Sequence, residues 1–473
     1  MELIKIDPVK RRRYRIRIYT GFAILLAALV GGTWVLDTFF RPRLVNVYST
    51  EELVSHPDVQ LFQEYVRIDT TEATGSEAAG AEFLARELAA AGIEPVIERL
   101  GDRRANVWGI LEGEERGAVV LHNHIDVFQV RNPDAWSSPP FAAEIDGVWL
   151  VGRGTFDMKS VAIVQLRAIQ ELARSGRKPK KSVIFLATGG EETGSDLGVR
   201  WILKQHPDLV ERFDLVLTEG GVVEPKSQEE IKYWGVEFAQ KSFAQLVVCA
   251  ERRERLEELR EDVLLWRLEN EVWRLTPEVE TFLAAYSGSR DRSYLQRVLT
   301  DPWKTIHRPK DFRKLPPYLR SAFRDEVVPL HIEELEDGTF RRRLFLHVLP
   351  GGDTGEIRRR LLPDWMLHGL TVAEEPELGS HDGSPIDGRD FQTILETVRE
   401  RYPRTEVGPY FLPWSATDSR FFREAGIPSY GFSPFLIFST DTYRVDAANE
   451  RISLPGFLTG LELYIDVVER LAG

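Results

Sequence analysis

Along most of the chain, segments with the hydrophobic pattern of strands alternate with segments that have the pattern of helices. Short, continuous apolar runs predict buried strands, and apolar residues three or four positions apart predict amphipathic helices. We expect strands at 107–112, 118–122, 182–188 and 215–217, and helices at 76–91, 158–175 and 197–205. This alternation predicts an α/β fold with a mainly parallel sheet, in which functional residues lie at the ends of strands.

The pattern changes in the middle of the chain. Residues 251–275 are dense in charge, with apolar residues at helical spacing, and predict a helix with a solvated face. A strand is expected at 340–348 and a helix at 355–362. We therefore expect a smaller α+β domain inserted between two parts of the α/β domain. The expected ranges are 41–240 and 378–473 for the α/β domain and 241–377 for the insert.

The N-terminal region differs from the rest in charge. Residues 1–43 contain nine Lys or Arg against three acids, whereas the remainder of the chain carries a net charge of −19. A basic cluster at 10–17 is followed by the uncharged residues 18–36, which as a helix would extend about 28 Å, close to the thickness of the bilayer hydrocarbon. Because few basic residues follow, the positive-inside rule keeps the N-terminus in the cytoplasm.

Two alternatives to a membrane anchor are weaker. A signal peptide has a shorter apolar region, of about 7–15 residues, and a small-residue cleavage site, for which residues 33–40 offer no convincing sequence. A buried helix is not expected beside six basic residues. We therefore predict a single-pass membrane protein with a cytoplasmic basic tail at 1–17, an uncleaved transmembrane anchor at 18–40, and an extracytoplasmic main part, which is periplasmic, extracellular or lumenal.

Composition narrows the function classes. The length of 473 residues suggests two to three domains, and 43% hydrophobic with 29% charged residues is typical of a folded globular protein. The net charge of −13 argues against a nucleic-acid partner, which requires a basic surface. The single cysteine, Cys249, excludes an internal disulfide framework and a cysteine-built zinc site.

Four clusters of potential metal ligands stand where strands are expected to end. They are His124-Ile125-Asp126, the turn 152–159 with Asp157, the pair Glu191-Glu192, and Glu219 before two glycines. A single acid in such a place is normally a helix cap or a solvated turn residue. Acids gathered at successive strand ends are unfavourable neighbours unless a cation neutralises them. The four clusters together therefore favour a two-metal hydrolase centre.

With these clusters, the chain resembles the co-catalytic zinc metallopeptidases, which include glutamate carboxypeptidase, aminoacylase, carnosinase, succinyl-diaminopimelate desuccinylase and carboxypeptidase S. The matching segments occur in the family's order and cover most of residues 50–470. They are His124-Ile125-Asp126-Val127, Trp136, Pro139-Pro140-Phe141, Gly152-Arg153-Gly154, Asp157-Met158-Lys159, Glu191-Glu192, Glu219-Gly220-Gly221, Thr417-Asp418-Ser419-Arg420, Gly426-Ile427-Pro428 and Asn449-Glu450-Arg451-Ile452. The chain looks most like the carboxypeptidase S and N-acyl amino acid hydrolase branch, whose members are membrane-anchored or secreted.

The resemblance implies a fold and residue roles. The α/β part would be a phosphorylase/hydrolase-like catalytic domain, and the insert a lid through which family members often form dimers. His124, Asp157 and Glu219 would hold one metal ion, and Asp157 would bridge to a second ion held by Glu192. Glu191 would be the general base, and Asp126 would hydrogen-bond His124 and fix its tautomer. The resemblance also implies a cis peptide bond between Asp157 and Met158.

The chain departs from the family pattern at one metal ligand. The family's last ligand is a histidine four residues before the Glu of the Asn-Glu-Arg-Ile segment, and here that position is Asp446. With Asp157 and Glu192 it would make an all-carboxylate site, which shifts the preference from Zn²⁺ toward Mn²⁺ or Mg²⁺.

The insert departs from the family where the family contacts its substrate. His347 stands where the family has an arginine that grips the substrate carboxylate, and an imidazole does not make the bidentate contact of a guanidinium. Glu326 stands where the family has an asparagine, and residues 247–254 contain no Gly-His-Ser-Ser segment. Residues 341–343 are three arginines that could compensate, or could form a solvated strand face.

Two hypotheses follow. The first is a membrane-anchored metallohydrolase that cleaves an amide bond in a peptide or N-acyl amino acid through metal-activated water, as a carboxypeptidase, dipeptidase or aminoacylase. It would use two divalent ions, of which zinc is favoured, and Mn²⁺ or Mg²⁺ is an alternative at the Asp446 site. It would contact the membrane through residues 18–40 and form a homodimer through the insert. The second is a catalytically impaired or inactive relative that acts as an extracytoplasmic binding or scaffold protein. The pair Glu191-Glu192 favours the enzyme, whereas Asp446 and His347 favour the second hypothesis.

Overall fold

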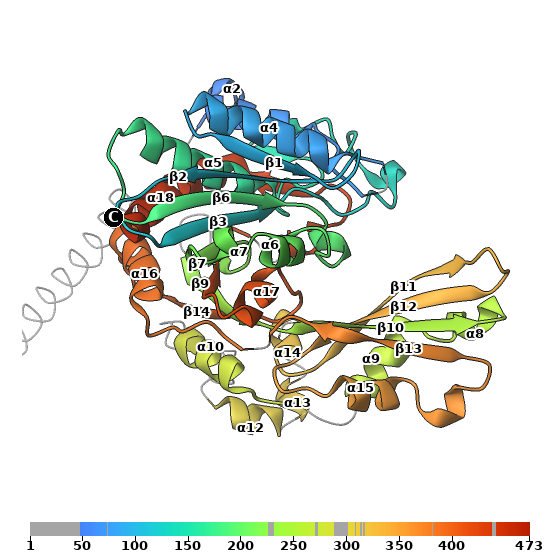
Figure 1. Cartoon of the computed structure of the whole chain (residues 1–473). Coiled ribbons are helices and arrows are strands. Elements are labelled where there is room, and N and C mark those ends of the chain that lie inside the picture. Colours follow the sequence, from blue (N-terminus) through green and yellow to red (C-terminus); the bar gives the residue numbers. More distant parts are fainter. Residues whose placement is uncertain are drawn as a thin grey trace, which may run out of the picture. The chain divides into compact units, whose positions relative to one another are not determined.

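The computed structural model describes residues 48–473, apart from residues 73, 226–230, 270–272, 288–300, 308, 313–314, 316, 381 and 438–440. The chain divides into two compact units, residues 1–44 and 45–473. The helices and strands of the second unit are labelled in Figure 1.

The prediction of a membrane-spanning helix, and with it of a single-pass membrane protein with an extracytoplasmic main part, is contradicted. Across the described residues, no helix is both long enough and apolar enough to cross a bilayer. The nineteen-residue helix α18 (Leu454–Ala472) illustrates the reason, because it contains Glu462, Asp466 and Glu469, and charges of this kind are costly in hydrocarbon. Residues 18–40, where the anchor was expected, lie outside the described residues.

A nine-stranded sheet is the largest sheet of the second unit. Its strands follow the order β1-β2-β6-β3-β7-β15-β9-β14, and β8 pairs with β9. They are β1 (Pro95–Arg99), β2 (Ala105–Leu111), β3 (Ala118–His124), β6 (Ser182–Thr188), β7 (Phe213–Thr218), β8 (Val222–Pro225), β9 (Ile231–Gln240), β14 (Val407–Leu412) and β15 (Ser429–Gly431). Every residue of β3 and β6 is buried, as their apolar sequences predict.

The sheet is mixed, so the prediction of a mainly parallel sheet is wrong in this respect. Strands β6, β3, β7 and β15 are mutually parallel neighbours, and β9 is parallel to β14. Strands β1 and β2, β2 and β6, β15 and β9, and β8 and β9 are antiparallel pairs. The short connection at 100–104 explains the first of these, because a parallel pair requires a much longer crossover.

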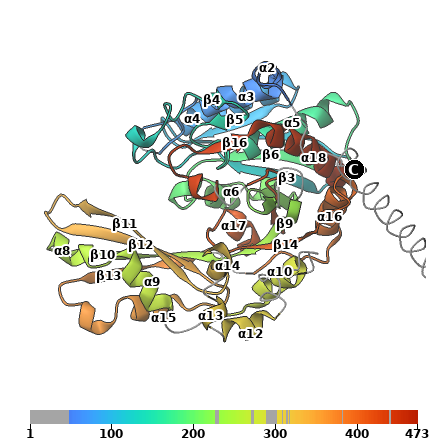
Figure 2. The ribbon, with the colours of Figure 1, turned by 180° about the vertical axis from the view of Figure 1, so that it is seen from behind.

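Helices cover both faces of this sheet (Figures 1 and 2). On one face, α4 packs on β1 and β2, and α5 packs on β3, β6 and α18. On the other face, α6, α7 and α17 share a core with Trp108, Val120 and Ile184. The helices of this part are α2 (Thr50–Ser55), α3 (Pro57–Val66), α4 (Glu77–Ala90), α5 (Lys159–Arg174), α6 (Val199–Gln205), α7 (Pro207–Val210), α16 (Arg389–Arg401), α17 (Ser419–Glu424) and α18.

A small sheet of three strands joins two distant parts of the sequence. It has the order β16-β5-β4, with β4 (Glu144–Asp146), β5 (Trp149–Val151) and β16 (Arg451–Ser453). Arg451 pairs with Val151 in this sheet. The turn after β5 and the loop before β16 are therefore neighbours.

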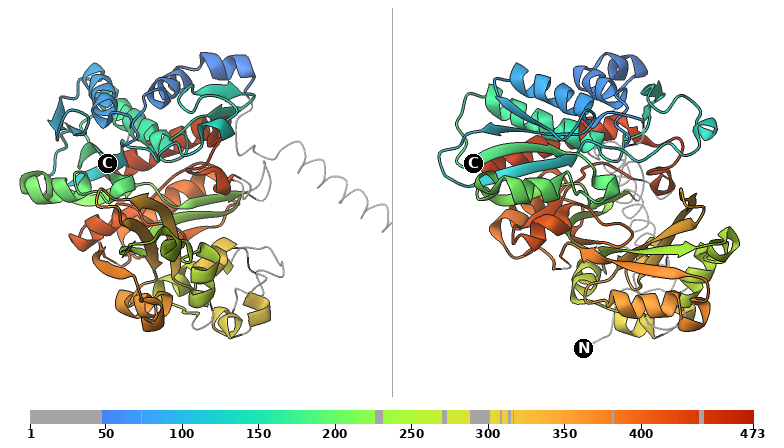
Figure 3. Two further views of the ribbon diagram at one scale, coloured as in Figure 1. Left: turned by 90° about the vertical axis from the view of Figure 1, so that its right-hand side faces the viewer. Right: turned by 45° about the vertical axis from the view of Figure 1, so that its right-hand side comes forward.

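A separate four-stranded sheet has the order β11-β12-β10-β13. Its strands are β10 (Ser242–Ala250), β11 (Glu326–Glu334), β12 (Phe340–Val348) and β13 (Thr371–Leu378). The helices α8 (Arg253–Glu257), α9 (Glu261–Glu269) and α15 (Thr354–Leu361) bury one of its faces in a core that includes Leu246, Leu264 and Leu346 (Figure 3).

The remaining helices between β10 and β11 are short. They are α10 (Pro277–Ser287), α12 (Pro302–Ile306), α13 (Pro309–Phe312) and α14 (Pro317–Ser321). Helix α10 packs on β14 of the nine-stranded sheet, where Phe282 meets Tyr410. Part of the range expected for the insert thus contacts the larger sheet, and the boundaries 241–377 stay a prediction.

Candidate metal centre

The parallel strands β3, β6 and β7 deliver acidic and histidine side chains to one edge of the large sheet. His124 is the last residue of β3 and pairs in register with Thr188, the last residue of β6. Glu191 and Glu192 follow β6 in a 3-10 turn, and Glu219 follows β7 directly. Because the carboxyl ends of parallel strands meet at one edge, the register of the sheet brings these side chains together.

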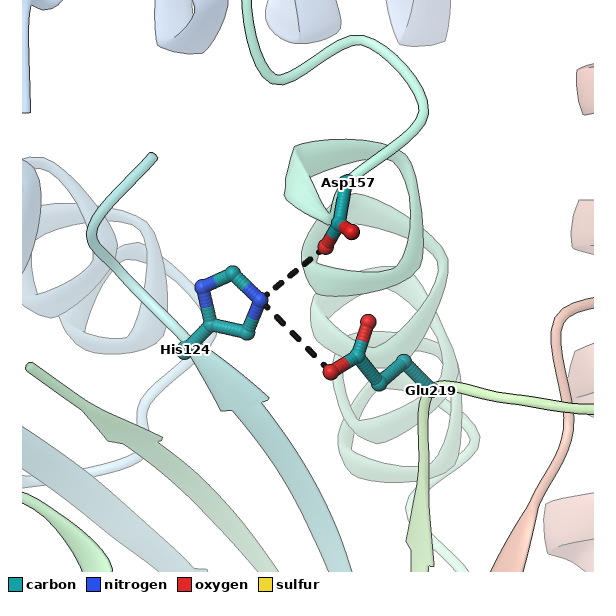
Figure 4. A group of neighbouring side chains, drawn as sticks. All are labelled: His124, Asp157 and Glu219. Atoms are coloured by element: carbon teal, nitrogen blue, oxygen red, sulfur yellow. Dashed lines mark hydrogen bonds and ion pairs between the residues drawn. The ribbon is translucent and has the colours of Figure 1, made fainter. Parts of the chain in front are cut away.

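One group of potential ligands consists of His124, Asp157 and Glu219 (Figure 4). The Nε2 atom of His124 lies 3.1 Å from Asp157 Oδ1 and 3.7 Å from Glu219 Oε1. Asp157 precedes α5, and its peptide bond to Met158 is cis, which confirms that prediction. The other ring nitrogen, Nδ1, lies 2.8 Å from the backbone oxygen of Asp126 and donates to it. With Nδ1 bonded to Asp126, Nε2 is the ring nitrogen that faces the two carboxylates.

Asp126 hydrogen-bonds His124 through its backbone carbonyl. Its carboxylate Oδ1 lies 3.6 Å from Nδ1. The carboxylate instead accepts hydrogen bonds from the backbone N–H groups of Glu191 and Glu192, at 3.1 and 3.0 Å. A single residue thus orients the imidazole and the turn that carries both glutamates.

A second group consists of Asp157, Glu192 and Asp446. In each group, one ligand atom from every residue lies within 4.8 Å of the others. Asp157 belongs to both groups, and its role as a bridge between two ions stays a prediction. A third, overlapping group of His124, Glu191 and Glu192 places Glu191 beside the same centre.

A buried ion pair, to which sequence reasoning assigned no role, holds this arrangement together. Arg153 Nη1 lies 2.6 Å from Glu450 Oε2 and 3.4 Å from Asp446 Oδ1, and its Nη2 donates to the backbone oxygen of Asp446. Glu450 also accepts hydrogen bonds from the backbone N–H groups of Gly154, Phe156 and Asp157. The signal in the sequence was that both residues lie in segments that match the family, Gly152-Arg153-Gly154 and Asn449-Glu450-Arg451-Ile452.

Burial has a strong electrostatic effect on the carboxylates of the centre. It raises the pKa of Glu191 to about 8. Burial, reinforced by neighbouring carboxylates, raises the pKa values of Glu192, Glu219 and Asp446 well above their ordinary range. Asp157 is the exception. Burial acts to raise its pKa, but the hydrogen bond and charge of His124, the hydrogen bond of Glu219 and the charge of Arg153 together lower it.

The donor set fits a pair of divalent cations. Several carboxyl groups with little access to water are unstable as anions unless positive charge lies among them. One imidazole nitrogen with oxygen donors suits Zn²⁺, and a bridging carboxylate suits two ions about 3.5–4 Å apart. The residues His124, Asp157 and Glu219 would hold one ion, and Asp157, Glu192 and Asp446 the other.

His347 lies outside both groups, on the four-stranded sheet. In register it faces Phe243 of β10 and Glu326 of β11. Burial, together with the positive charge of the nearby Lys241, lowers its pKa to about 4. The ring is therefore neutral at pH 7, and its role in substrate binding stays a prediction.

Comparison with known proteins shows the family. The model of peptidase family M20/M25/M40 matches residues 120–470. Aminoacylase-1B of Rattus norvegicus is 24% identical over 441 residues, which are 88% of this chain and 96% of the relative. These matches decide between the two hypotheses drawn from the sequence. The chain is a metal-dependent hydrolase, and the inactive binding or scaffold protein is not favoured.

Solved structures share the fold. Human carnosine dipeptidase 1 superposes with a TM-score of 0.66 at 15% identity, over 89% of this chain and 98% of its own. A dinuclear metal-binding peptidase of the M20 family from Bacillus subtilis gives a TM-score of 0.52 at 10% identity, over 88% and 97%. The family match over residues 120–470 shows that this chain belongs to peptidase family M20/M25/M40.

Proposed function

We propose that the chain hydrolyses the amide bond of an N-acyl amino acid or a peptide, with Glu191 as the general base. The observation that carries the proposal is the overlap of the ligand groups, in which a carboxylate oxygen of Glu191 lies within 4.8 Å of ligand atoms of His124 and Glu192. The aminoacylase relative supports an acyl amino acid as the substrate class. The bound ions would polarise the scissile carbonyl and lower the pKa of a water molecule.

The surroundings of Glu191 suit proton transfer. Its backbone N–H is held by Asp126, and its side chain is only 11% exposed. Because burial raises its pKa to about 8, the carboxylate is a stronger base than a solvated glutamate. Glu191 would take a proton from the attacking water at a carboxylate oxygen and deliver it to the nitrogen of the leaving amine.

The two ligand groups differ in metal preference. The group with His124 offers an imidazole and two carboxylates, which suits Zn²⁺. The group with Asp446 offers carboxylates alone, a harder set that favours Mn²⁺ or Mg²⁺. We infer that zinc occupies the first group and that the second accepts zinc or a harder ion.

The test compares the full chain with Glu191→Gln, each re-equilibrated with Zn²⁺ or Mn²⁺. Release of free amine from N-acyl amino acids and dipeptides is measured together with metal content. We expect Glu191→Gln to lower kcat by about 10²- to 10⁴-fold and to leave the metal content unchanged. The matched control is Glu64→Gln, at an exposed position of α3. Unchanged turnover in Glu191→Gln would contradict the assignment of the base.

A further inference from the structure

We propose that Arg420 binds the free carboxylate of the substrate, in place of the arginine that the family resemblance implies where this chain has His347. The inference rests on the proposed function and names the residue that recognises the carboxylate. Arg420 lies in α17, next to Glu191.

The guanidinium of Arg420 has donors without a partner. Its side chain is 4% exposed, and Nη1 donates to the backbone oxygen of Thr417 at 2.8 Å and lies 3.9 Å from Glu191 Oε1. The Nε atom is buried and makes no hydrogen bond with any described residue. Because Nε is enclosed by the chain, a ligand carboxylate would meet the guanidinium at its Nη groups, and a buried guanidinium without a full set of partners favours such a contact.

The position of the guanidinium is fixed before any ligand binds. A Cβ atom added to Gly379 would lie 2.4–2.9 Å from the aliphatic carbons of Arg420, which shows how closely the chain surrounds the side chain. The backbone of Ser380 donates to the Arg420 carbonyl oxygen, and the guanidinium carbon lies 4.4 Å from the centre of the Phe421 ring. A preorganised arginine loses little side-chain entropy when it binds a carboxylate.

The distance from the metal centre matches a small substrate. Glu191 lies within 4.8 Å of His124 and Glu192, and Arg420 lies 3.9 Å from Glu191. In an N-acyl amino acid, three bonds separate the scissile carbonyl carbon from the carboxylate carbon, a span of at most about 4 Å. A scissile carbonyl beside the metal ligands thus places the carboxylate within reach of Arg420.

Four other cations of this region have partners already. Arg153 is paired with Glu450, and Lys241 binds Ser321 and Glu326. On β12, Arg341 is paired with Glu333, and Arg342 donates to backbone oxygens of Leu330 and Leu256. Arg341 and Arg342, two of the three strand arginines that could compensate for His347, are thus engaged elsewhere.

The test uses a matched pair of substrates, N-acetyl-leucine and N-acetyl-leucinamide, which differ only in the carboxylate. We expect wild type to prefer the acid, and Arg420→Gln to lower kcat/KM for the acid by about 10- to 100-fold, mainly through KM. The amide should change by less than about threefold. Arg420→Lys should restore part of the acid activity, and the control Arg341→Gln should behave as wild type.

Other outcomes overturn the inference. An equal loss on both substrates would show that Arg420 positions Glu191 rather than binding substrate, and no loss would show that it does neither. If the Arg420 variants do not fold, the test is the rate of the wild-type enzyme on N-acetyl-leucine compared with its rate on N-acetyl-leucinamide. Equal rates on the two substrates contradict the inference.

A binding measurement separates this inference from the proposed function. Calorimetry with L-leucine and L-leucinamide on the metal-loaded full chain requires no turnover. Preference for L-leucine that is lost in Arg420→Gln supports the inference even if neither N-acetyl substrate is hydrolysed, in which case only the proposed function fails. Equal binding of the acid and the amide by wild type overturns the inference alone.

Discussion

The two ligand groups of the metal centre share Asp157 but are built differently. His124 and Glu219 come from the ends of β3 and β7, two neighbouring parallel strands inside the large sheet. Asp446 comes from a loop, has a left-handed backbone with φ 57°, and keeps a third of its side chain exposed. The register of the sheet positions the first group, whereas a loop and an ion pair with Arg153 position part of the second.

This difference has a consequence for the ions. Ligands on strands are held by the ladder of backbone hydrogen bonds, and the imidazole tautomer is fixed by the Asp126 carbonyl. Asp446 depends on contacts with Arg153, which also serve Glu450. We therefore expect the first group to bind its ion more tightly and the second to be more permissive in the ion it accepts.

The largest effect is expected where the two groups meet. Asp157→Asn removes the shared carboxylate, so both ions should be weakened together. We expect activity to fall by about 10³-fold or more, because metal ions contribute several kcal/mol to catalysis, and metal content to fall below one ion per chain. Elemental analysis and amine release provide the measurements, with the exposed Asp208→Asn on α7 as control. Loss of a single ion would show that Asp157 is no bridge.

A smaller effect should distinguish the second group from the first. Asp446→His replaces a carboxylate by an imidazole, so the ratio of Zn²⁺ to Mn²⁺ retained from an equimolar mixture should rise by about tenfold. Asp446→Glu, which keeps the carboxylate, should leave the ratio unchanged. If both variants retained the wild-type ratio of Zn²⁺ to Mn²⁺, the claim that the two groups differ in metal preference would be contradicted.

The smallest effect concerns a buried acid outside both groups. Burial raises the pKa of Glu77 to about 8, with Asp126 contributing, whereas the unfolded value is near 4.5. The folded protein therefore holds a proton that the unfolded protein releases, and stability should fall as pH rises from about 4.5 to 8. The slope from this one group is at most about 1.4 kcal/mol per pH unit.

Chemical denaturation across this pH range measures that slope. Glu77→Gln should make it shallower in the metal-loaded protein, in which the ions neutralise the acids of the two groups. An identical slope in wild type and Glu77→Gln would mean that Glu77 is already ionised in the folded protein.

Elements with a strong local pattern could be predicted from the sequence. The strand expected at 182–188 is β6, the strand expected at 340–348 is β12, and the helix expected at 158–175 is α5, one residue shorter at each end. In each case local hydrophobic spacing carries the information. The ends of β3, β6 and β7 also carry the acids that were expected to gather.

Features set by distant pairings could not be predicted in the same way. The sheet is mixed because β2 and β9 pair antiparallel with strands far along the chain, which no local pattern encodes. Arg153 and Glu450 form an ion pair across 297 positions. The site roles and a homodimer through the insert stay predictions, because they concern ions, substrate and a second chain.

Metal stoichiometry of the full chain tests the central claim most directly. The chain is purified without chelator, re-equilibrated with Zn²⁺ or Mn²⁺, and measured by elemental analysis, with Asp446→Ala alongside. The account predicts two ions per chain in wild type and one in Asp446→Ala, because His124, Asp157 and Glu219 would still hold the first. One ion or none in wild type would contradict the claim that Asp446 completes a second site.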